Sequence, residues 1–508
     1  MERLVKLLLE ENLIRARQEY LETVKLHGRG DFRDVGVTVY TSSLYKKNDI
    51  LHLIASIDNR KNFFLLAERE FKCDFQGEAF TISGVQVIRA DFSWENYLVL
   101  KDQFPFVAPV SLRDKKTTIG CGDRLGLATP GHIRAVKKFD VYPVLAQQSI
   151  RELTLTGRNY QGVVADAAFL VFQEGYEKGY GADGDHLKRI EDIDVALDAG
   201  MPMITLDLTE VMNPAVSSLS RERIEVEFEN LSEAVKEKVL RAYSGRQFTV
   251  GNSSISFTEP EAKKCALMYW KALDFSARVD EHLKKRRGSQ YDLEISIDET
   301  TSPTLPSHHL FIAAELKSRG VTVNSLAPRF VGEFQKGIDY IGSVEEFERQ
   351  FKEHCDIAKA YGNYKISIHS GSDKFSVYPV IGKYTQGRLH LKTAGTSWLE
   401  AVRTIAKNRP GLYREMHKKA LANFPEAKKL YHITADITKI QDVDSIADRE
   451  LPEYLNIADS RQLLHITYGM LKDPEIRFDF FRSLAEVEEA HYSSVAENIE
   501  KHIRLLGL

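Results

Sequence analysis

The segment Tyr291–His309, with the sequence YDLEISIDETTSPTLPSHH, contains the pattern that decides the fold of this chain. Aliphatic and polar residues alternate in its first half, which is the two-residue period of a β-strand. Glu294 lies within that strand, although an unpaired carboxylate is costly to bury. A polar loop with Glu299 and Thr301 follows, and then a helix start at paired histidines. This order is typical of the active-site rim of a (β/α)8 barrel; a half-exposed strand with a solvated loop is the alternative.

Length and composition narrow the class of protein. The chain has 508 residues, 43% of them hydrophobic and 28% charged, so it can bury a large core and carry additional regions. A net charge of −4 argues against nucleic-acid binding. The cysteines are scattered without a CxxC pair, which suits a reducing compartment and excludes a compact cysteine zinc site. The N-terminal segment is amphipathic and unlike a signal peptide, and no run reaches a membrane span. We therefore expect a cytoplasmic protein without a membrane partner.

Strand-like segments that end in polar residues and lead into helix-like segments recur from Thr117 onward. This repetition predicts an α/β fold with a TIM-like (β/α)8 barrel over residues 113–410. The charge-rich stretch 211–288 breaks the rhythm and is predicted to be a helical insertion. Residues 1–112 are predicted to form an N-terminal α+β cap, and residues 411–508 a C-terminal helical region.

The first predicted unit is followed by Asp123, Arg124 and several glycines. Glycines allow the backbone to approach a ligand closely, and Arg124 could clamp a carboxylate. A structural ion pair that holds the loop is the alternative for these two charged residues. The segment is not a GxGxxG fingerprint with a following acidic partner, so we do not predict a dinucleotide site.

The next informative stretch, YGADGDHLK, places Asp185 directly before His186. It resembles the first half of a calcium loop, but Val195 stands nearest to where the closing glutamate is required. A base beside a metal ligand fits better, because a neutral imidazole binds the ion and the ion keeps the neighbouring carboxylate ionised. Helix capping is the alternative, which explains the aspartate well and the histidine poorly.

Three later strands end in similar polar residues. One leads to Arg329, Glu333 and Gln335, and the next ends at His369, followed by Gly371 and Ser372. The last carries His390 and Lys392 and leads into a turn of small residues that could receive an anion at a helix N-terminus. A lone histidine is usually structural, but several strands that end alike favour a shared site.

Six motifs together resemble the tagaturonate (fructuronate–tagaturonate) epimerases of bacterial hexuronate breakdown: GDRLGLATPGHIRA, GADGDHLK, LEISIDETTSPTLPSHH, LAPRFVGEFQKG, SIHSGSDKFSVYP and LHLKTAGTSWLEA. The resemblance is strong over residues 115–410. It implies a TIM-like barrel that uses a divalent metal cation (Zn, Mn, Ni or Co) to interconvert D-fructuronate and D-tagaturonate. A ketouronate is therefore the expected small-molecule partner, and a homo-oligomer is one option for the assembly.

The resemblance also implies roles for individual residues. Asp185 would be the proton acceptor and Glu294 the proton donor, while His186 and His369 would bind the metal. A third metal ligand is expected at Gln335, with Glu333 and His390 as alternatives.

The carboxylate of the substrate is expected to contact a cationic side chain, because a bidentate guanidinium suits it. The candidates are Arg124, Arg329 and Lys392, for which ion pairs at the barrel rim are the alternative. Asp123 and His308 are further candidate substrate-binding residues.

The chemistry limits the mechanism. The two ketouronates differ at one hydroxyl-bearing carbon that is β to the ketone, so simple enolisation cannot invert it. A retro-aldol route, which breaks and re-forms the adjacent C–C bond, needs a Lewis-acid metal and a base for the hydroxyl proton. Direct proton exchange at that carbon remains an alternative mechanism. The alternative functions are a metal-dependent aldolase or ketose isomerase, and a non-catalytic sugar-acid-binding subunit.

Overall fold

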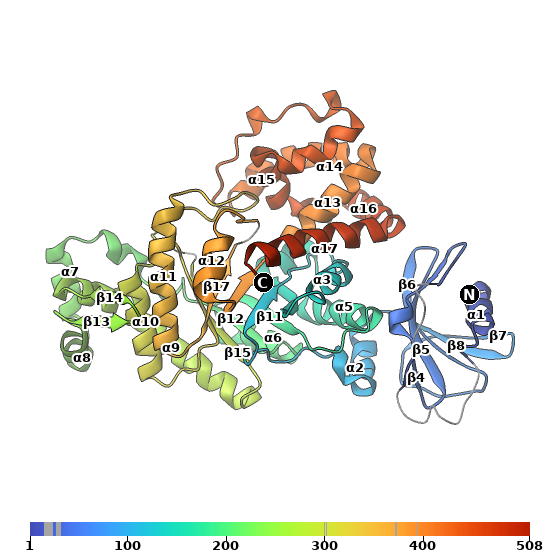
Figure 1. Ribbon diagram of the computed structural model, residues 1–508, viewed down its shortest axis with the longest axis horizontal. Helices are drawn as coiled ribbons and strands as arrows, with labels where there is room; N and C mark the ends of the chain where they lie inside the picture. The colour runs from blue at the N-terminus through green and yellow to red at the C-terminus, as the bar shows by residue number, and fades with distance from the viewer. Residues whose placement is uncertain (15–23, 27–31, 299, 301, 371–372, 394) are drawn as a thin grey trace.

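The computed structural model describes residues 1–14, 24–26, 32–298, 300, 302–370, 373–393 and 395–508 (Figure 1). Four residues named above lie outside the described residues: Glu299, Thr301, Gly371 and Ser372.

Eight parallel strands close into a barrel in the order β10-β11-β12-β15-β16-β17-β18-β9. They are β9 (Thr117–Gly120), β10 (Tyr142–Ser149), β11 (Gly181–Leu187), β12 (Met203–Asp207), β15 (Asp292–Ile297), β16 (Ser325–Pro328), β17 (Lys365–His369) and β18 (Leu389–Lys392). The predicted TIM-like barrel is confirmed. In β15, Leu293 and Ile295 join the hydrophobic core, while Glu294 contacts Lys392 across the barrel. The alternation that identified the strand therefore places a carboxylate inside the barrel.

Helices after the strands cover the outside of the barrel, as Figure 1 shows. They are α3 (Thr129–Val136), α4 (Ile150–Thr156), α5 (Tyr160–Gln173), α6 (Ile190–Asp198), α9 (Glu259–Arg287), α10 (Pro306–Ser318), α11 (Val344–Ala360), α12 (Tyr378–Thr385) and α13 (Thr396–Asn408). A capping box fixes the start of α4: the Ser149 hydroxyl accepts from the Glu152 amide, and the Glu152 carboxylate accepts from the Ser149 amide. Strand β10, which ends at Ser149, is thus followed directly by helix α4, with no connecting loop between them.

The stretch 211–288, between β12 and β15, projects to one side of the barrel (Figure 1). It contains η4 (Pro214–Ser218), α7 (Arg221–Glu229), α8 (Glu233–Tyr243), β13 (Gln247–Val250), β14 (Ser253–Ser256) and α9. The antiparallel hairpin β13–β14 was not predicted, because its strands are short and half exposed.

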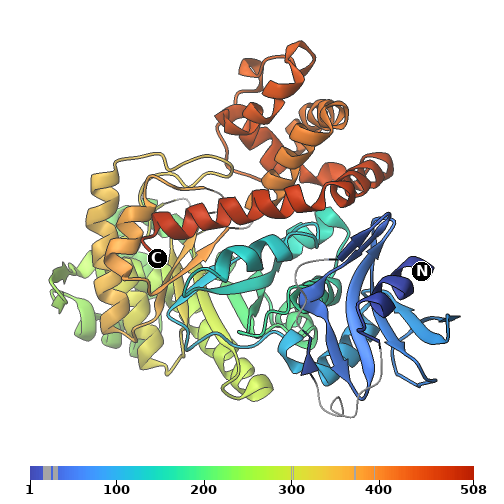
Figure 2. The ribbon, with the colours of Figure 1, turned by 45° about the vertical axis from the view of Figure 1, so that its right-hand side comes forward.

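The N-terminal region is an antiparallel sheet with one helix on its outer face (Figures 1 and 2). Its elements are α1 (Glu2–Glu10), β1 (Val24–Lys25), β2 (Phe32–Asp34), β3 (Val37–Val39), η2 (Thr41–Ser43), β4 (Tyr45–Lys47), β5 (Ile50–Ile57), β6 (Arg60–Ala67), β7 (Gly77–Ile82), β8 (Val85–Ala90), α2 (Trp94–Gln103) and η3 (Pro105–Val107). Phe63 of β6 packs edge-on against Phe172 of α5, with ring centroids 5.3 Å apart. The sheet thus shares its inner core with the barrel.

The C-terminal region lies on the barrel and has a hydrophobic core of its own. It contains α14 (Pro410–Lys428), η5 (Ile437–Lys439), η6 (Val443–Ser445), η7 (Asp448–Asn456), α15 (Ala458–Ile466), η8 (Tyr468–Lys472), α16 (Pro474–Glu486) and α17 (Glu488–Leu505). The last helix, α17, runs back along the barrel and packs on α3 and α13 (Figures 1 and 2). Among the described residues, we find no helix with both the length and the apolar character that a membrane crossing requires.

Candidate active site

Glu294 is the central buried carboxylate of the barrel, with no exposed surface. Its Oε1 atom lies 2.7 Å from His369 Nε2 and 3.0 Å from Lys392 Nζ, and its Oε2 atom accepts a hydrogen bond from the Ser325 hydroxyl. These partners come from β16, β17 and β18. The fold therefore resolves the cost of burying Glu294 by surrounding it with donors.

Lys392 is the central cation beneath the barrel mouth (the hub of the network), because three carboxylates surround it. Its Nζ atom lies 2.6 Å from Asp185 Oδ1, 3.0 Å from Asp183 Oδ2 and 3.0 Å from Glu294 Oε1, and it also donates to the Thr205 hydroxyl. One ammonium thus joins carboxylates from β11 and β15. Lys392 was expected to bind the substrate carboxylate, but in this structure its contacts are with these protein groups.

The ionisable groups of this network have pKa values that are shifted in different directions. Burial would lower the pKa of Lys392, but the surrounding carboxylates outweigh burial and raise that pKa well above its ordinary value. Burial raises the pKa of Asp183 to about 6, although Lys392 opposes the shift. Burial also acts to raise the pKa of Asp185 and Glu294, but Lys392 and nearby histidines outweigh it, so both pKa values are lowered. At neutral pH, Asp185 and Glu294 are therefore carboxylates.

His186 stands at an irregularity in β11. Its φ is +54°, in the left-handed region, and the pairing of β11 with β12 shifts register between Gly184 and Leu187. Neighbours on a regular strand point to opposite faces, but this bulge allows both Asp185 and His186 to lie at the barrel mouth. Such local strain is typical of functional sites.

His186, Asp298 and His369 form a group of possible metal ligands at the mouth. One donor atom from each lies within 4.8 Å of the others, and the two imidazole centroids are 5.0 Å apart. Asp298 Oδ2 lies 3.0 Å from His369 Nδ1. Burial acts to raise the pKa of Asp298, but the two histidines and the Ser296 hydroxyl outweigh it, so its pKa is lowered and the carboxylate is ready to coordinate. Two imidazoles and a carboxylate suit first-row divalent metal ions.

The expected third ligand, Gln335, has other contacts in this structure. Its side-chain oxygen accepts from the amide and hydroxyl of Thr434, at 3.0 and 2.9 Å, and from Gln462 Nε2 at 3.1 Å. The alternative Glu333 lies 3.2 Å from His432, and His390 is buried lower in the barrel, where it bonds Thr118. The third residue of the group is thus Asp298, which directly follows β15.

Three of the candidate substrate-binding residues lie outside this group. Asp123 accepts hydrogen bonds from the amides of Leu125, Gly126 and Ala128 and so fixes its own loop. Arg124 is buried, with Nε 2.8 Å from Glu152 Oε1 and its guanidinium 3.8 Å from the centroid of Tyr468. His308 Nδ1 is 3.0 Å from the Tyr269 hydroxyl. Arg124 thus pairs with Glu152, and Asp123 holds its loop through backbone amides, while their roles in substrate binding stay predictions.

Two cavities flank the group of possible metal ligands. One, of about 330 Å³, is lined by Asp298, His369 and Arg329 among others. The other, of about 350 Å³, is lined by His186 and by other residues at the ends of β10, β11 and β12 or just after them. Arg151 of α4 lines both cavities. The candidate Arg329 thus has access to the site, with Glu333 3.9 Å from its guanidinium.

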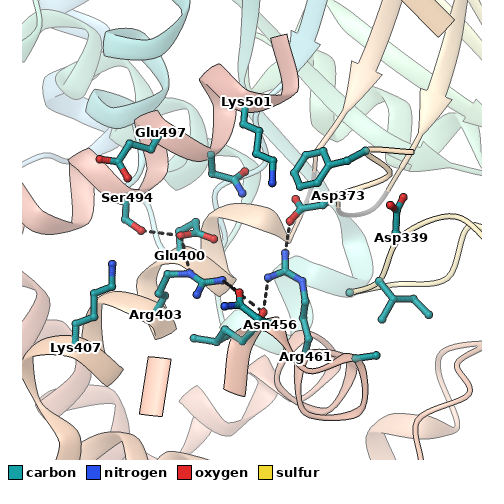
Figure 3. A pocket seen from close by; sticks show the side chains of 16 residues that line it. Asp339, Asp373, Glu400, Arg403, Lys407, Asn456, Arg461, Ser494, Glu497 and Lys501 are labelled. Atoms are coloured by element: carbon teal, nitrogen blue, oxygen red, sulfur yellow. Dashed lines mark hydrogen bonds and ion pairs between the residues drawn. The ribbon is translucent and has the colours of Figure 1, made fainter. Parts of the chain in front are cut away.

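A further cavity, of about 450 Å³, lies between the C-terminal helices and the barrel loops (Figure 3). Its main charged groups already pair with one another: Arg461 lies 2.5 Å from Asp373, and Arg403 lies 3.3 Å from Glu400. The ion pair between Arg461 and Asp373 holds the loop after His369 in place, and we assign no chemistry to this cavity.

Asp298, Asp183 and Arg151 were not singled out from the sequence, and the structure places them in or beside this network. The signal for Asp298 was its place immediately after a buried strand, and for Asp183 its two-residue spacing from Asp185. No local pattern marks Arg151, because its place beside both cavities and Tyr431 arises only from the folded chain.

The chain matches known proteins over almost its whole length. The tagaturonate/fructuronate epimerase of Thermotoga maritima is 40% identical over 476 residues, which are 93% of this chain and 97% of that protein. Two crystal structures of the fructuronate-tagaturonate epimerase UxaE from Cohnella laeviribosi, one native and one with glycerol, are each 45% identical. Each has a TM-score of 0.88 and covers 93% of this chain and 96% of its own. A family model described as tagaturonate epimerase matches residues 40–506, and the chain therefore belongs to the tagaturonate epimerase family of isomerases.

Proposed function

We propose that this protein is a divalent-metal-dependent epimerase that interconverts D-tagaturonate and D-fructuronate. The observation that carries the proposal is the group His186, Asp298 and His369 beside two ionised carboxylates, in a chain of this family. The names of the relatives supply the substrates. His186, His369 and Asp298 would hold the ion, which when bound would act as a Lewis acid on the ketone of the substrate.

The side chains support a retro-aldol route. Asp185 accepts the proton of the hydroxyl on the carbon to be inverted, and the bond between that carbon and its neighbour next to the ketone breaks. The hydroxyl carbon becomes an aldehyde, and the electron pair of the broken bond passes to the ketone fragment. After the aldehyde turns by half a rotation, the bond forms again on its opposite face. Lys392, which lies within hydrogen-bond distance of both carboxyl groups, passes the proton from Asp185 to Glu294, and Glu294 donates it to the new alkoxide, so atoms and charge balance without an oxidant.

Lys392 supports both carboxylates in this scheme. It lies within hydrogen-bond distance of Asp185 and Glu294, so proton uptake by one of them changes the charge that the other experiences. The polar interior keeps both groups in place without exposing them to water, because each is almost completely buried.

Proton NMR of D-tagaturonate with the purified protein tests the proposal. We expect D-fructuronate to accumulate, the reaction to stop on chelation, and activity to return with Mn, Ni, Zn or Co. Activity that resists chelation would contradict the metal dependence, and three-carbon fragments would favour the aldolase. In D₂O, the inverted carbon should retain its hydrogen; deuterium at that carbon would favour direct proton exchange.

A further inference from the structure

The substrate of the proposed reaction carries a carboxylate, and two of the cations expected to bind it have other partners. Arg124 pairs with Glu152 in the interior, and Lys392 contacts carboxylates below the mouth. A cation that binds the substrate carboxylate is therefore expected among the side chains at the mouth. The cavities show the side chains that a small molecule can meet there.

Arg151 lies between the two cavities that flank His186, Asp298 and His369. It belongs to α4, whose start is fixed by the capping box at Ser149. Within the two sets of lining residues, Arg151 is the one that the cavities share.

Tyr431 of the C-terminal region orients the guanidinium of Arg151. The centroid of its ring lies 4.8 Å from the guanidinium carbon, and its hydroxyl lies 2.9 Å from that of Tyr468. A cation stacked on an aromatic face keeps its N–H groups directed sideways, where they can meet a planar anion.

Each of the other lysines and arginines among these lining residues lines one cavity: Lys188 and Arg189 line the cavity at His186, and Arg329 and Lys336 line the cavity at Asp298. Arg349 of α11 belongs to neither set and pairs with Glu346, so it provides a control of the same charge.

In a ketouronate the ketone lies two bonds from the inverted carbon on one side, and the carboxylate lies two bonds away on the other. A substrate with its ketone near His186 and His369 directs its carboxylate into one of the two flanking cavities. Arg151 lines whichever cavity receives it.

We propose that Arg151 binds the carboxylate of the substrate and makes the enzyme specific for ketouronates over uncharged ketohexoses. This proposal rests on the proposed function for its substrate class. A bidentate guanidinium–carboxylate pair gives both affinity and orientation, whereas a ketohexose has a hydroxymethyl group at that position. Arg151 is thus a specificity-determining residue that makes no contribution to the breaking bond itself.

The test measures binding and turnover of D-tagaturonate and of D-tagatose, its uncharged counterpart, by the full-length protein supplied with Mn²⁺. In Arg151→Gln, we expect affinity and kcat/KM for tagaturonate to fall by about 10- to 100-fold, the effect of one strong charged pair. Binding of tagatose should change by less than about threefold, on the scale of lost uniform binding. Arg151→Lys should fall between the wild type and Arg151→Gln, and Arg349→Gln, outside both cavities, should behave as the wild type.

Equal losses for both sugars, or unchanged binding of tagaturonate in a folded Arg151→Gln variant, would overturn the proposal. Thermal unfolding and bound-metal content of each variant identify a loss that comes from misfolding; Arg151→Lys then decides the question, because it keeps the charge. If the wild type binds tagaturonate without converting it, the proposed function fails while the variants still decide the role of Arg151. If it does not bind tagaturonate, both proposals fail.

Discussion

At the residue scale, the barrel depends on the single positive charge of Lys392. We predict that Lys392→Met destabilises the protein by about 3–5 kcal/mol, because buried carboxylates lose their counter-charge. Activity should fall by at least about 10³-fold, since Asp185 and Glu294 lose their common partner. The loss of stability can be measured by denaturant unfolding at pH 7.

The pH dependence of the Lys392→Met variant provides the internal check. Without Lys392, burial raises the carboxylate pKa values above those of the unfolded chain, and such groups contribute more stability in the protonated form. The variant should therefore regain stability as pH falls from 7 towards 5. In the wild type, the pKa of Glu294 is lowered, so its contribution to stability is lost as pH falls below about 4.5. A variant with the same pH profile as the wild type would contradict the hub role of Lys392.

A second prediction at this scale concerns the third metal ligand. Asp298→Asn should weaken metal binding by about 10- to 100-fold, because it removes the charged donor of the group. Gln335→Leu should leave metal affinity unchanged, since the Gln335 oxygen faces Thr434 and Gln462. Metal content after dialysis against a graded series of chelator concentrations distinguishes the two. If Gln335→Leu loses the metal while Asp298→Asn retains it, Gln335 is the third metal ligand.

The structure brings predicted site residues together where strands set the side-chain direction. Asp185, Glu294 and His369 lie on β11, β15 and β17, and the two-residue period and the closure of the barrel bring them together. Prediction was weakest in loops, because the direction of Gln335 depends on contacts with residues about 100 positions later. The catalytic roles of Asp185 and Glu294 and the metal-binding role of His369 stay predictions until the variants are measured.

At the element scale, the C-terminal region holds the loops of the barrel mouth. Arg461 of α15 pairs with Asp373, four residues after His369, as Figure 3 shows. Lys374 donates to the carbonyl oxygens of Gln335 at 2.9 Å and Ile338 at 2.6 Å, which ties two loops together. The region that the sequence presents as a simple extension therefore positions the rim of the site.

The buried amine of Lys374 gives this anchoring a pH signature. Burial lowers the pKa of Lys374 to about 7, below the ordinary value near 10.5 in the unfolded chain. The unfolded chain therefore binds more protons between pH 7 and about 10, and stability should rise with pH through that interval. In Lys374→Met, the slope of unfolding free energy against pH should be smaller than in the wild type. Equal slopes from denaturant unfolding at pH 7 to 9.5 would refute this assignment.

At the scale of the whole molecule, the barrel was predictable because buried strands with polar residues at their ends recur along the chain and alternate with helices. The contribution of the C-terminal region to the site was not. Tyr431 and His432 line a cavity at the mouth, yet they lie almost 40 residues beyond the last barrel strand. Their position follows from the packing of α14 and α15 on α13, which no local pattern encodes.

The C-terminal residues after α17 pack against α12, and Gly382 allows the two backbones to approach closely. A Cβ atom added at Gly382 of α12 would overlap the carbonyl of Leu506, directly after α17. Alanine normally favours a helix over glycine by about 0.5–1 kcal/mol. At Gly382 we predict the opposite sign: Gly382→Ala should destabilise the protein by about 1–3 kcal/mol, the usual cost of overpacking, because backbone must shift.

Gly411 of α14 is the matched control, because a Cβ atom there would meet nothing within 4 Å. Gly411→Ala should therefore be neutral or should stabilise the protein by up to about 1 kcal/mol. Denaturant unfolding of both variants tests whether the C-terminus is docked in solution as it is in this structure. If α17 were detached from the barrel, both glycines would lie in open helices, and Gly382→Ala would stabilise the protein as Gly411→Ala does.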